Sequence, residues 1–232
     1  MLNQWFWGCY ATCYDTLTQL RPYQQMHADL IASLDLRPGM RVLDAGCGTG
    51  NLERTLAERG LDCQVTAIDF SPEMIRRAQV KCAGSGLQVS FQVVDLNGPL
   101  PFPAGSFDRI VSNNVLYALR DPVAVLDQFA HVLTPTGRMA HAIPLQGFSM
   151  HAVLQEHLQH LQGLQKLSLL RIVPQLLVVA LYNLTIFRQV DDGQYTFFTQ
   201  EEALGLTQRQ GWRGHLGRTY AQQDWLIALE RN

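Results

Sequence analysis

Residues 42–51 read VLDAGCGTGN, an apolar run that meets glycine at every second position. The segment from Arg41 to Ala45 has the composition of a buried strand, and the segment from Asn51 to Gly60 has the spacing of a helix that ends at a glycine. A strand, a glycine-rich turn and a helix in this order predict the first unit of a parallel sheet. Because this turn lacks side chains at three places, we expect its backbone to lie close to a bound molecule.

The alternation of strands and helices continues from this turn to Ile143. Further strands are predicted at 63–69, 87–95, 107–113 and 138–143, with helices at 71–83 and 122–133. Such a pattern predicts a mostly parallel sheet that is covered by helices on both faces. Sheets of this kind bind ligands beyond the carboxyl ends of their strands. Four polar residues fall at these predicted ends: Asp44, Asp69, Asp95 and Asn113.

The remaining segments complete the predicted organisation. Residues 1–36 have helical spacing, and residues 145–189 form a helical insertion that is poor in charge. A helix capped by Thr199 and Glu202 and ended by Gly211 precedes two closing strands, which we expect to form an antiparallel hairpin. The predicted fold is therefore Rossmann-like, with seven mostly parallel strands, N-terminal helices and an insertion after the fifth strand. Its core comprises residues 37–144 and 190–232.

Composition excludes several classes of protein. The 232 residues carry a formal net charge of −2, without the basic excess that nucleic-acid-binding surfaces need. The longest uncharged run, residues 172–187, falls short of the roughly 20 apolar residues of a membrane-spanning helix. The N-terminus lacks the pattern of a secretory signal, and the five cysteines include no C-x-x-C pair. We therefore expect a cytoplasmic protein with reduced thiols, no nucleic-acid partner and no transmembrane segment.

The spacing of the glycines distinguishes between ligand classes. In the dinucleotide-binding pattern G-x-G-x-x-G the last place would fall on Asn51, and no Gly-Lys-Ser/Thr of a phosphate loop follows. The pattern D-x-G-x-G-x-G instead resembles the first motif of the class I S-adenosylmethionine-dependent methyltransferases. AIDFSPEMIRRA at 67–78 and FQVVDLNGPLPFPAGSFDRIVSNNVLYALRDP at 91–122 resemble later parts of the same family. HVLTPTGRM at 131–139 does so too, with Thr136 where a glycine is usual. Among relatives, the chain looks most like the small-molecule branch that includes ubiquinone and menaquinone biosynthesis enzymes.

The resemblance implies a site for S-adenosylmethionine, with S-adenosylhomocysteine as the product. It places Asp44 near the methionine ammonium, directly or through water, Asp69 on both ribose hydroxyls and Asn113 beside the methyl group through its backbone or amide. The other implied cofactor-binding residues are Tyr14, Gly46, Gly48, Gly50, Phe70, Met74, Asp95 and Leu96. Phe70 and Met74 would flank the adenine, and Asp95 would accept from its amino group. Plainer interpretations stay open: Asp95 as a turn residue, Met74 as core, and Tyr14 as part of a packing stripe with Phe6 and Tyr10.

Methyl transfer from a sulfonium is an in-line displacement that needs little dedicated machinery. Two residues are candidates for a catalytic role. Tyr117 stands where relatives often have histidine, and it either faces the acceptor or packs under the following turn. His151 lies in the helical insertion and is a candidate base. No metal site is expected, because His157 and His160 have no carboxylate or cysteine nearby.

The insertion carries the prediction about the acceptor. Up to Phe187 its only charged residues are Glu156, Lys166 and Arg171, so it must bury apolar surface against something. We expect a lid over an apolar pocket for a lipophilic or aromatic small molecule. The predicted lining is Phe148, Met150, Leu154, Leu177, Tyr182 and Ile186. A homodimer interface, plain core packing and peripheral contact with a membrane remain alternatives.

Two other classes of protein are kept as rivals. A methyltransferase-like protein that binds the cofactor without transferring a methyl group would carry the same motifs. A nicotinamide-dependent reductase would share the fold, but the register of the glycines counts against it.

Overall fold

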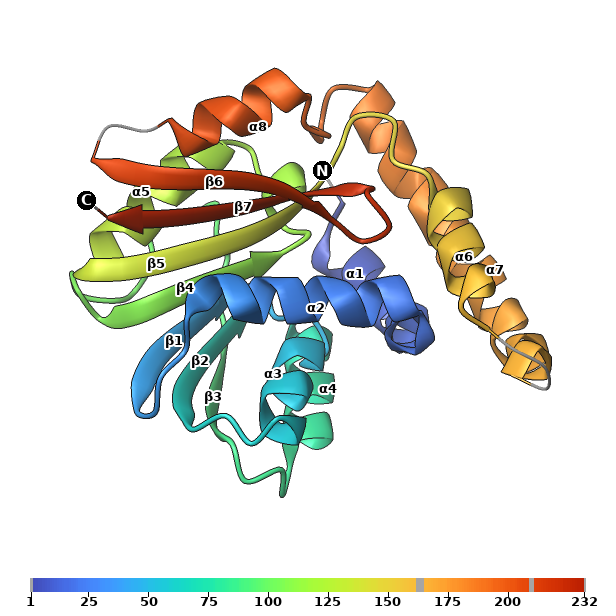
Figure 1. The fold of residues 1–232 in the computed structure, drawn as a ribbon, viewed down its shortest axis with the longest axis horizontal. Helices are drawn as coiled ribbons and strands as arrows, with labels where there is room; N and C mark the ends of the chain where they lie inside the picture. Colours follow the sequence, from blue (N-terminus) through green and yellow to red (C-terminus); the bar gives the residue numbers. More distant parts are fainter. Residues whose placement is uncertain (1, 162–164, 209–210, 232) are drawn as a thin grey trace.

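The computed structural model describes residues 2–161, 165–208 and 211–231. Seven strands in this part of the chain form one sheet in the order β3-β2-β1-β4-β5-β7-β6 (Figure 1). The strands are β1 (Met40–Ala45), β2 (Cys63–Asp69), β3 (Gln88–Val93), β4 (Phe107–Asn113), β5 (Leu133–Pro144), β6 (Trp212–Thr219) and β7 (Asp224–Arg231). The first five are parallel, and β7 runs antiparallel to both β5 and β6. The predicted fold class and its C-terminal hairpin are confirmed.

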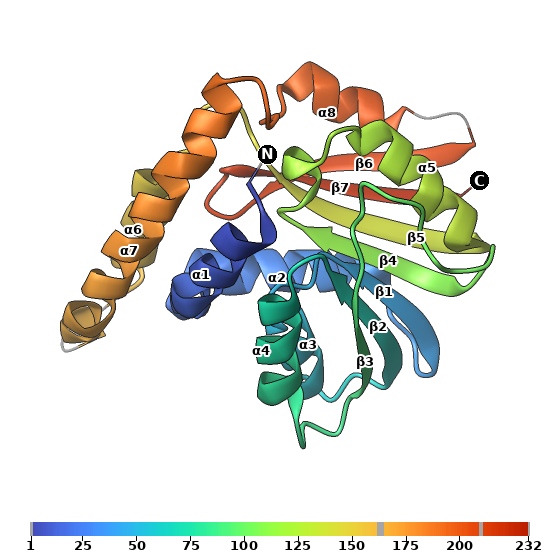
Figure 2. The same ribbon diagram turned by 180° about the vertical axis from the view of Figure 1, so that it is seen from behind.

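Helices cover both faces of the sheet. They are α1 (Gln4–Tyr14), η1 (Asp15–Gln19), α2 (Arg21–Leu34), α3 (Asn51–Glu58), α4 (Pro72–Cys82), η2 (Leu116–Ala118), α5 (Pro122–Val132), α6 (Met150–Gln159), α7 (Gln165–Asp191) and α8 (Gln200–Thr207). Helix α2 crosses the face that is in front in Figure 1, and α5 lies on the opposite face, seen in front in Figure 2. The core between these layers includes Leu43, Ile110 and Phe129, all with no exposed surface.

Local capping fixes where the helices next to the sheet begin. The Ser71 hydroxyl accepts from the N–H of Met74, and Pro72 occupies the first turn of α4. Helix α8 begins with the predicted reciprocal bonds between Thr199 and Glu202. Because the cap of α4 follows β2 directly, it holds the first turn of this helix at the carboxyl end of the sheet.

Two predicted boundaries were wrong. The strand expected from residue 138 already begins at Leu133, because Leu133 pairs with Phe107 and a register shift before the pair Arg109–Arg138 accommodates the β5 residues between. The helix expected to run to Gly211 ends at Thr207. Neither difference moves the carboxyl ends of the strands, where the predicted site lies.

Helices α6 and α7 lie side by side along one flank of the molecule, next to α1 (Figures 1 and 2). Among the described residues, the part of α7 from Ile172 to Asp191 is long and apolar enough to cross a membrane, by length and composition alone. Only 22% of its most apolar window is buried. Val179 and Ile186 pack into the protein, whereas Leu177 and Leu181 are more than 60% exposed. The helix thus turns one apolar face inward and another to the surroundings.

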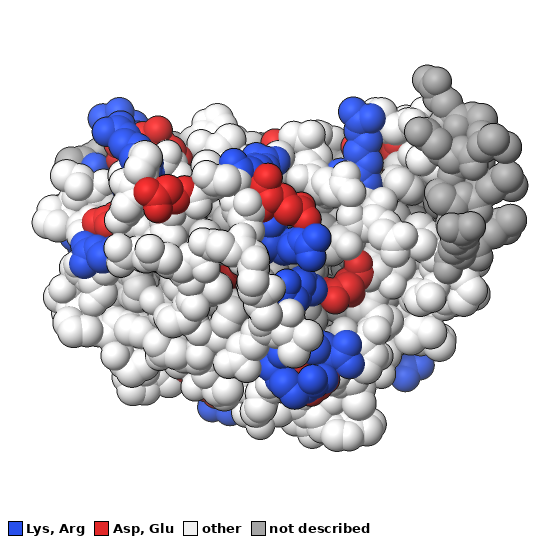
Figure 3. Space-filling view, turned by 90° about the horizontal axis from the view of Figure 1, so that it is seen from below, with Lys and Arg blue, Asp and Glu red and all other residues white. Residues whose placement is uncertain are grey.

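The surface drawn in Figure 3 carries acidic and basic side chains in small, interspersed groups. This pattern agrees with the formal net charge of −2. On this face the distribution offers no basic stripe for a polyanion.

Candidate active site

A cavity opens at the carboxyl edge of the sheet, and α1 and α7 contribute to its wall. It encloses about 1260 Å³ of empty space, counting its open mouth. Most of the residues that the sequence assigned to the cofactor or acceptor line this cavity: Tyr14, Gly46, Gly48, Asp69, Phe70, Met74, Asp95, Leu96, Asn113 and Tyr117. The structure therefore brings together predicted site residues from α1, the glycine turn, the ends of β2, β3 and β4, and η2.

Each of the three positions in the turn requires glycine for a different structural reason. All have a positive φ, which favours glycine. A Cβ on Gly48 would lie 3.7 Å from the Tyr14 ring and 4.0 Å from Met74 Sδ, so this position is open toward the cavity. A Cβ on Gly46 would overlap Val115, and one on Gly50 would lie 2.9 Å from Ala78 Cβ. The prediction that all three approach a ligand was wrong for Gly50, which lets α3 pack on α4.

Asp69 presents a carboxylate to the cavity in a fixed orientation. Its Oδ2 accepts from the Gly48 N–H at 3.0 Å, and its Oδ1 accepts from the Ser71 N–H at 2.9 Å. Burial raises the pKa of Asp69 to about 6, against the lowering effect of these backbone bonds. Each carboxylate oxygen keeps a further lone pair. The side chain therefore suits a ligand that offers two adjacent hydroxyl groups.

Asp44 is not placed for direct contact with a ligand in the cavity. It is buried against Glu53 of α3 and does not line the cavity, since α3 covers this side of β1. Burial, followed by the neighbouring Glu53 charge, raises the pKa of Asp44 well above its usual range. Burial also raises the pKa of Glu53. Asp44 thus stands behind the glycine turn, and its acidic neighbour had no signal in the sequence.

Asp95 and Met74 each combine the two interpretations that the sequence left open, a cavity residue and a structural residue. Asp95 lines the cavity, yet its Oδ1 also accepts from the backbone N–H and the side-chain amide of Asn97, both at 2.9 Å. Met74 is 4% exposed and lines the cavity beside Gly48. Asp95 is therefore a turn residue at the cavity rim, and Met74 is a core residue with one side toward the cavity.

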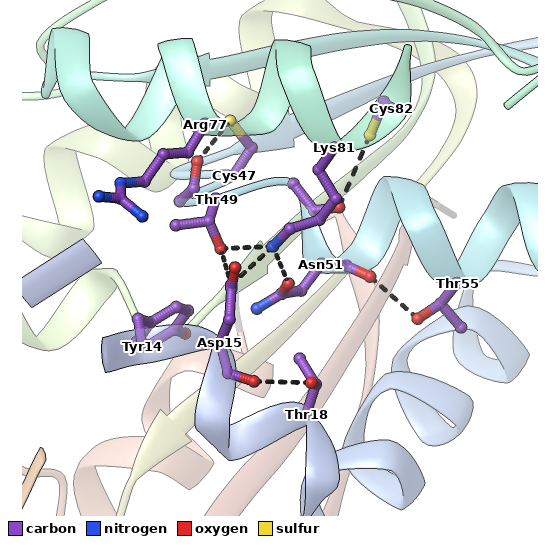
Figure 4. A network of polar contacts seen from close by, with 12 residues as sticks. Tyr14, Asp15, Thr18, Cys47, Thr49, Asn51, Thr55, Arg77, Lys81 and Cys82 are labelled. Atoms are coloured by element: carbon purple, nitrogen blue, oxygen red, sulfur yellow. Dashed lines mark hydrogen bonds and ion pairs between the residues drawn. The ribbon is translucent and has the colours of Figure 1, made fainter. Parts of the chain in front are cut away.

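A network of four polar side chains, called the clasp, holds the N-terminal segment against the glycine turn (Figure 4). Lys81 Nζ of α4 donates to Asp15 Oδ1 at 2.6 Å, to Thr49 Oγ1 at 2.9 Å and to Asn51 Oδ1. Thr49 also donates to Asp15. Because Tyr14 precedes Asp15, the clasp holds the Tyr14 ring over Gly48. Sequence analysis missed it, since its members are up to 66 positions apart.

Replacing Lys81 with methionine is expected to release this clasp. The change leaves Asp15 without its cation and should cost about 1–2 kcal/mol of unfolding free energy, discounted because Asp15 is 43% exposed. Urea denaturation measures it. The matched control is Arg54→Met, whose ion pair with Glu58 is more than half exposed on both sides and should contribute under about 0.5 kcal/mol. Equal losses in the two variants would contradict the clasp.

Asn113 is anchored from α2 by a histidine that sequence analysis did not single out. Asn113 Nδ2 lies 3.2 Å from His27 Nε2, and His27 Nδ1 lies 3.2 Å from Thr55 Oγ1. Burial lowers the pKa of His27 to about 3, so the ring is neutral at pH 7. Nε2 therefore accepts from the amide when Nδ1 carries the proton. The Asn113 amide faces the cavity in an orientation set by this ring.

The two catalytic candidates have different outcomes. Tyr117 is 6% exposed, lines the cavity and packs edge-on against Tyr195 and Phe197 at 5.7 and 5.5 Å. Burial raises the pKa of Tyr117 well above its usual range, so its phenol stays protonated. Tyr117 therefore gives the cavity an aromatic wall and a neutral hydroxyl group. The structure contradicts a role for His151. This side chain is exposed, because α6 docks on α2 through the opposite face, where His157 accepts from the Arg21 N–H.

The predicted lining of the insertion was partly right. Phe148, Met150 and Ile186 line the cavity. Leu177 is 63% exposed, and Tyr182 packs 5.2 Å from both Phe6 and Tyr10. Leu154 is also absent from the cavity wall. The apolar pattern of α7 runs most of the way round the helix, so it could not indicate which face points inward.

Comparison with known proteins shows similarity over the glycine turn and the strands that follow it. Residues 42–137 match the family described as a methyltransferase domain. The ubiquinone biosynthesis O-methyltransferases of Xylella fastidiosa (strain 9a5c) and Xanthomonas campestris pv. campestris (strain B100) are 37% and 35% identical over 124 residues, which is 51% of this chain. The chain spans about half the length of the curated relatives it matches.

Solved structures agree on the fold. A SAM-dependent methyltransferase from Aquifex aeolicus has a TM-score of 0.61 at 17% identity, covering 94% of this chain and 93% of that one. The geranyl diphosphate C-methyltransferase from Streptomyces coelicolor A3(2) has a TM-score of 0.61 at 15% identity, covering 89% and 78%. The fold is that of the class I S-adenosylmethionine-dependent methyltransferases. Residues 42–137 match a methyltransferase domain, and the similar proteins named here are methyltransferases according to their names.

Proposed function

We propose that the chain is an S-adenosylmethionine-dependent methyltransferase whose acceptor is a small lipophilic or aromatic molecule. The observation that carries this proposal is the continuity of the cavity. The glycine turn and Asp69 line the same cavity as aromatic side chains from α1, η2 and the segments around α7. A polar cofactor end and an apolar acceptor end within one cavity suit the transfer of a small group between two bound molecules.

The residues of the first end fit S-adenosylmethionine. Asp69 has two oxygens with spare lone pairs for the ribose hydroxyls, and Gly48 leaves backbone open for the methionine part. Phe70 and Met74 would flank the adenine, with Asp95 and Leu96 at its edge. The cofactor, when bound, supplies a methyl group on a sulfonium. Asp44 does not line the cavity, so it would interact with the cofactor only across the glycine turn.

The other end suits an apolar acceptor. Its wall is formed largely by aromatic rings: Trp7, Tyr117, Phe148, Phe187, Tyr195 and Phe197. We propose that residues 145–189 act as a lid, because α7 contributes Asn183, Ile186 and Phe187 to this wall. The wall excludes water and holds the acceptor in line with the methyl group. When bound, the cofactor would supply the methyl carbon to the attacking atom and keep the electrons of the broken carbon–sulfur bond on sulfur, and an acceptor with an O–H or N–H group would lose its proton.

The names of the relatives support an acceptor of the prenylated phenol or quinol type. The five cysteines are all free, which supports a reducing, cytoplasmic location. The exposed apolar face of α7 leaves room for peripheral membrane contact or for a second copy in a homodimer.

A turnover screen tests the proposed function. The purified chain is incubated with S-adenosylmethionine and a series of phenols that differ in the length of an apolar chain, and formation of S-adenosylhomocysteine is measured. We expect kcat/KM to rise with apolar chain length. If small polar acceptors turn over while lipophilic phenols neither react nor inhibit, the proposed acceptor class is wrong. If the cofactor binds and no acceptor reacts, the chain is a binding protein without transfer activity.

Cofactor affinity should depend on pH through Asp69. The ribose hydroxyls donate to its ionised form, and the pKa of the folded protein's Asp69 is raised to about 6. Affinity for S-adenosylhomocysteine is therefore expected to be nearly constant above pH 7 and to fall about fivefold between pH 6 and pH 5. Calorimetry at several pH values measures this. Asp69→Asn should bind weakly with little change across the range, and a wild-type affinity that rises at low pH would contradict the assignment.

A further inference from the structure

The cavity wall carries a group of buried polar atoms that lack hydrogen-bond partners among the described residues. They are Asn113 Oδ1, Asn114 Oδ1 and Tyr220 OH, with Asp224 Oδ1 behind them. Asn113, Asn114 and Tyr220 line the cavity, whereas Asp224 does not. Buried polar atoms are nearly always paired in folded proteins, because an unpaired one costs stability. Several such atoms on one cavity wall therefore indicate a place where a ligand supplies the missing partners.

Asn114 and Asp224 are joined by a directional contact. Asn114 Nδ2 donates to Asp224 Oδ2 at 3.0 Å, and Asp224 has no exposed surface. Since the amide nitrogen faces the carboxylate, the carbonyl oxygen Oδ1 is on the other branch of the side chain, free of a partner within the protein. An ionised carboxylate can only accept hydrogen bonds, so it fixes this orientation of the amide.

The backbone at this place is strained. Asn114 has φ of 54° and Tyr220 has φ of 50°. Asparagine tolerates the left-handed region, but a bulky residue such as tyrosine rarely adopts it. Such strain persists where the surroundings hold it, and it is concentrated at functional sites. Here the rings of Tyr23 and Phe148 pack against Tyr220 at 6.0 and 5.9 Å.

Among the titratable groups in this part of the structure, Asp224 is the one whose charge changes with pH. Titratable neighbours are Tyr14 of α1, Tyr117 of η2 and Tyr220 of the β6–β7 turn, whose pKa values burial raises. From α2, Tyr23 packs on Tyr220, His27 is neutral and Asp29 is engaged by Thr219 Oγ1 at 2.6 Å. Burial raises the pKa of Asp224 to about 7, and the bond from Asn114 opposes this shift.

We propose that Asn114 and Tyr220 bind the hydrogen-bond-donating group of the acceptor, and that Asp224 is a positioning residue that turns the Asn114 carbonyl oxygen toward it. This inference rests on the proposed function and concerns the acceptor end of the same cavity. With Asp224 ionised, Asn114 offers an acceptor to a hydroxyl or amine group. With Asp224 protonated, the carboxyl can donate to the Asn114 oxygen, and the amide then turns its N–H groups to the cavity.

A binding experiment with two matched probes tests the inference without turnover. The probes are 4-butylphenol, which offers a hydroxyl donor, and 4-butylanisole, its methyl ether without that donor. A phenol has a pKa near 10, like tyrosine, so neither probe titrates between pH 6 and pH 8. Affinities are measured by calorimetry with saturating S-adenosylhomocysteine, which keeps the cofactor end occupied.

For the wild-type chain we expect 4-butylphenol to bind about tenfold more tightly at pH 8 than at pH 6, since the ionised fraction of a group with a pKa of about 7 changes by that factor. In Asp224→Asn the affinity should be weaker at pH 8 and nearly independent of pH. Asp69, which also titrates in this region, is present in both proteins and cancels in the comparison. Binding of 4-butylanisole should change little with pH in either protein.

Tyr220→Phe provides the control for a purely structural role. Removing a buried hydroxyl that has no partner should leave Tm unchanged or raise it, while the affinity for 4-butylphenol falls several-fold. A structural role would instead lower Tm and weaken both probes equally.

The outcomes separate the inference from the proposed function. If the wild-type chain does not bind S-adenosylhomocysteine, the proposed function fails. If it binds the cofactor product but Asp224→Asn keeps the wild-type pH profile for 4-butylphenol, the positioning role of Asp224 is overturned and the proposed function stands. Failure of 4-butylphenol to bind more tightly than 4-butylanisole at pH 8 overturns the role of Asn114 and Tyr220.

Discussion

Replacing Asp69 with alanine is expected to weaken binding of S-adenosylhomocysteine by about two to four orders of magnitude. Two hydrogen bonds from the ribose hydroxyls to a carboxylate are lost, each worth about 1.5–3 kcal/mol. The substitution also removes the acceptor for the Gly48 and Ser71 N–H groups, which lie 3.0 and 2.9 Å from the carboxylate. The glycine turn then loses one of its contacts with the end of β2, while the bonds from Gly46 N–H and Cys47 N–H to the Ile68 carbonyl remain. Isothermal calorimetry on the folded variant measures the effect.

Asp95→Ala is the matched comparison for this experiment. Asp95 also ends near the cavity, but it is exposed and its Oδ1 is already engaged by Asn97. Removing it should reduce the affinity by no more than about tenfold, the value of one hydrogen bond. If Asp69→Ala keeps the wild-type affinity while its unfolding transition is intact, the ribose is not held by Asp69. The assignment of the whole cofactor end would then have to change.

The fold and most residues of the proposed cofactor end were predictable because their signals are local. A strand, a glycine turn and a capped helix occupy adjacent residues, and the side chain at the end of a parallel strand must emerge at the ligand-binding edge. Asp69 and Asn113 follow this rule and line the cavity. Asp44 does not, because the packing of α3 places Glu53 beside it. The side of a strand end that a helix covers depends on tertiary packing and is not encoded in the strand itself.

The acceptor end was less predictable because its residues come from distant segments. His27 meets Asn113 across 86 positions, and Asn114 meets Asp224 across 110. No periodicity links such pairs. The orientation of the helical insertion was equally hidden. His151 was a reasonable candidate by residue type, but the docking of α6 on α2 leaves it exposed. The side of α6 that carries His157 is the buried one. Helical spacing alone could not show which side of the helix would be buried.

Replacing Gly46 with alanine is expected to destabilise the fold by about 2–5 kcal/mol, a large share of the stability of a typical domain. One part is the left-handed backbone, with φ of 88°, which costs a residue with a Cβ about 1–2 kcal/mol. The other part is overlap with Val115, since the new Cβ would fall within the space of its side chain. Overpacking of this kind costs about 1–3 kcal/mol. Urea denaturation of the variant measures the sum.

Two further variants divide this sum into its parts. Gly39 has a similar φ of 79°, but a Cβ there would meet nothing within 4 Å, so Gly39→Ala should cost only the backbone share of about 1–2 kcal/mol. Val115→Ala combined with Gly46→Ala should recover part of the loss, with a coupling of about 1–3 kcal/mol in a double-mutant cycle. Equal destabilisation by Gly39→Ala and Gly46→Ala, without coupling to Val115, would show that close packing is not the reason for this glycine. The turn would then need glycine at position 46 for its backbone conformation alone.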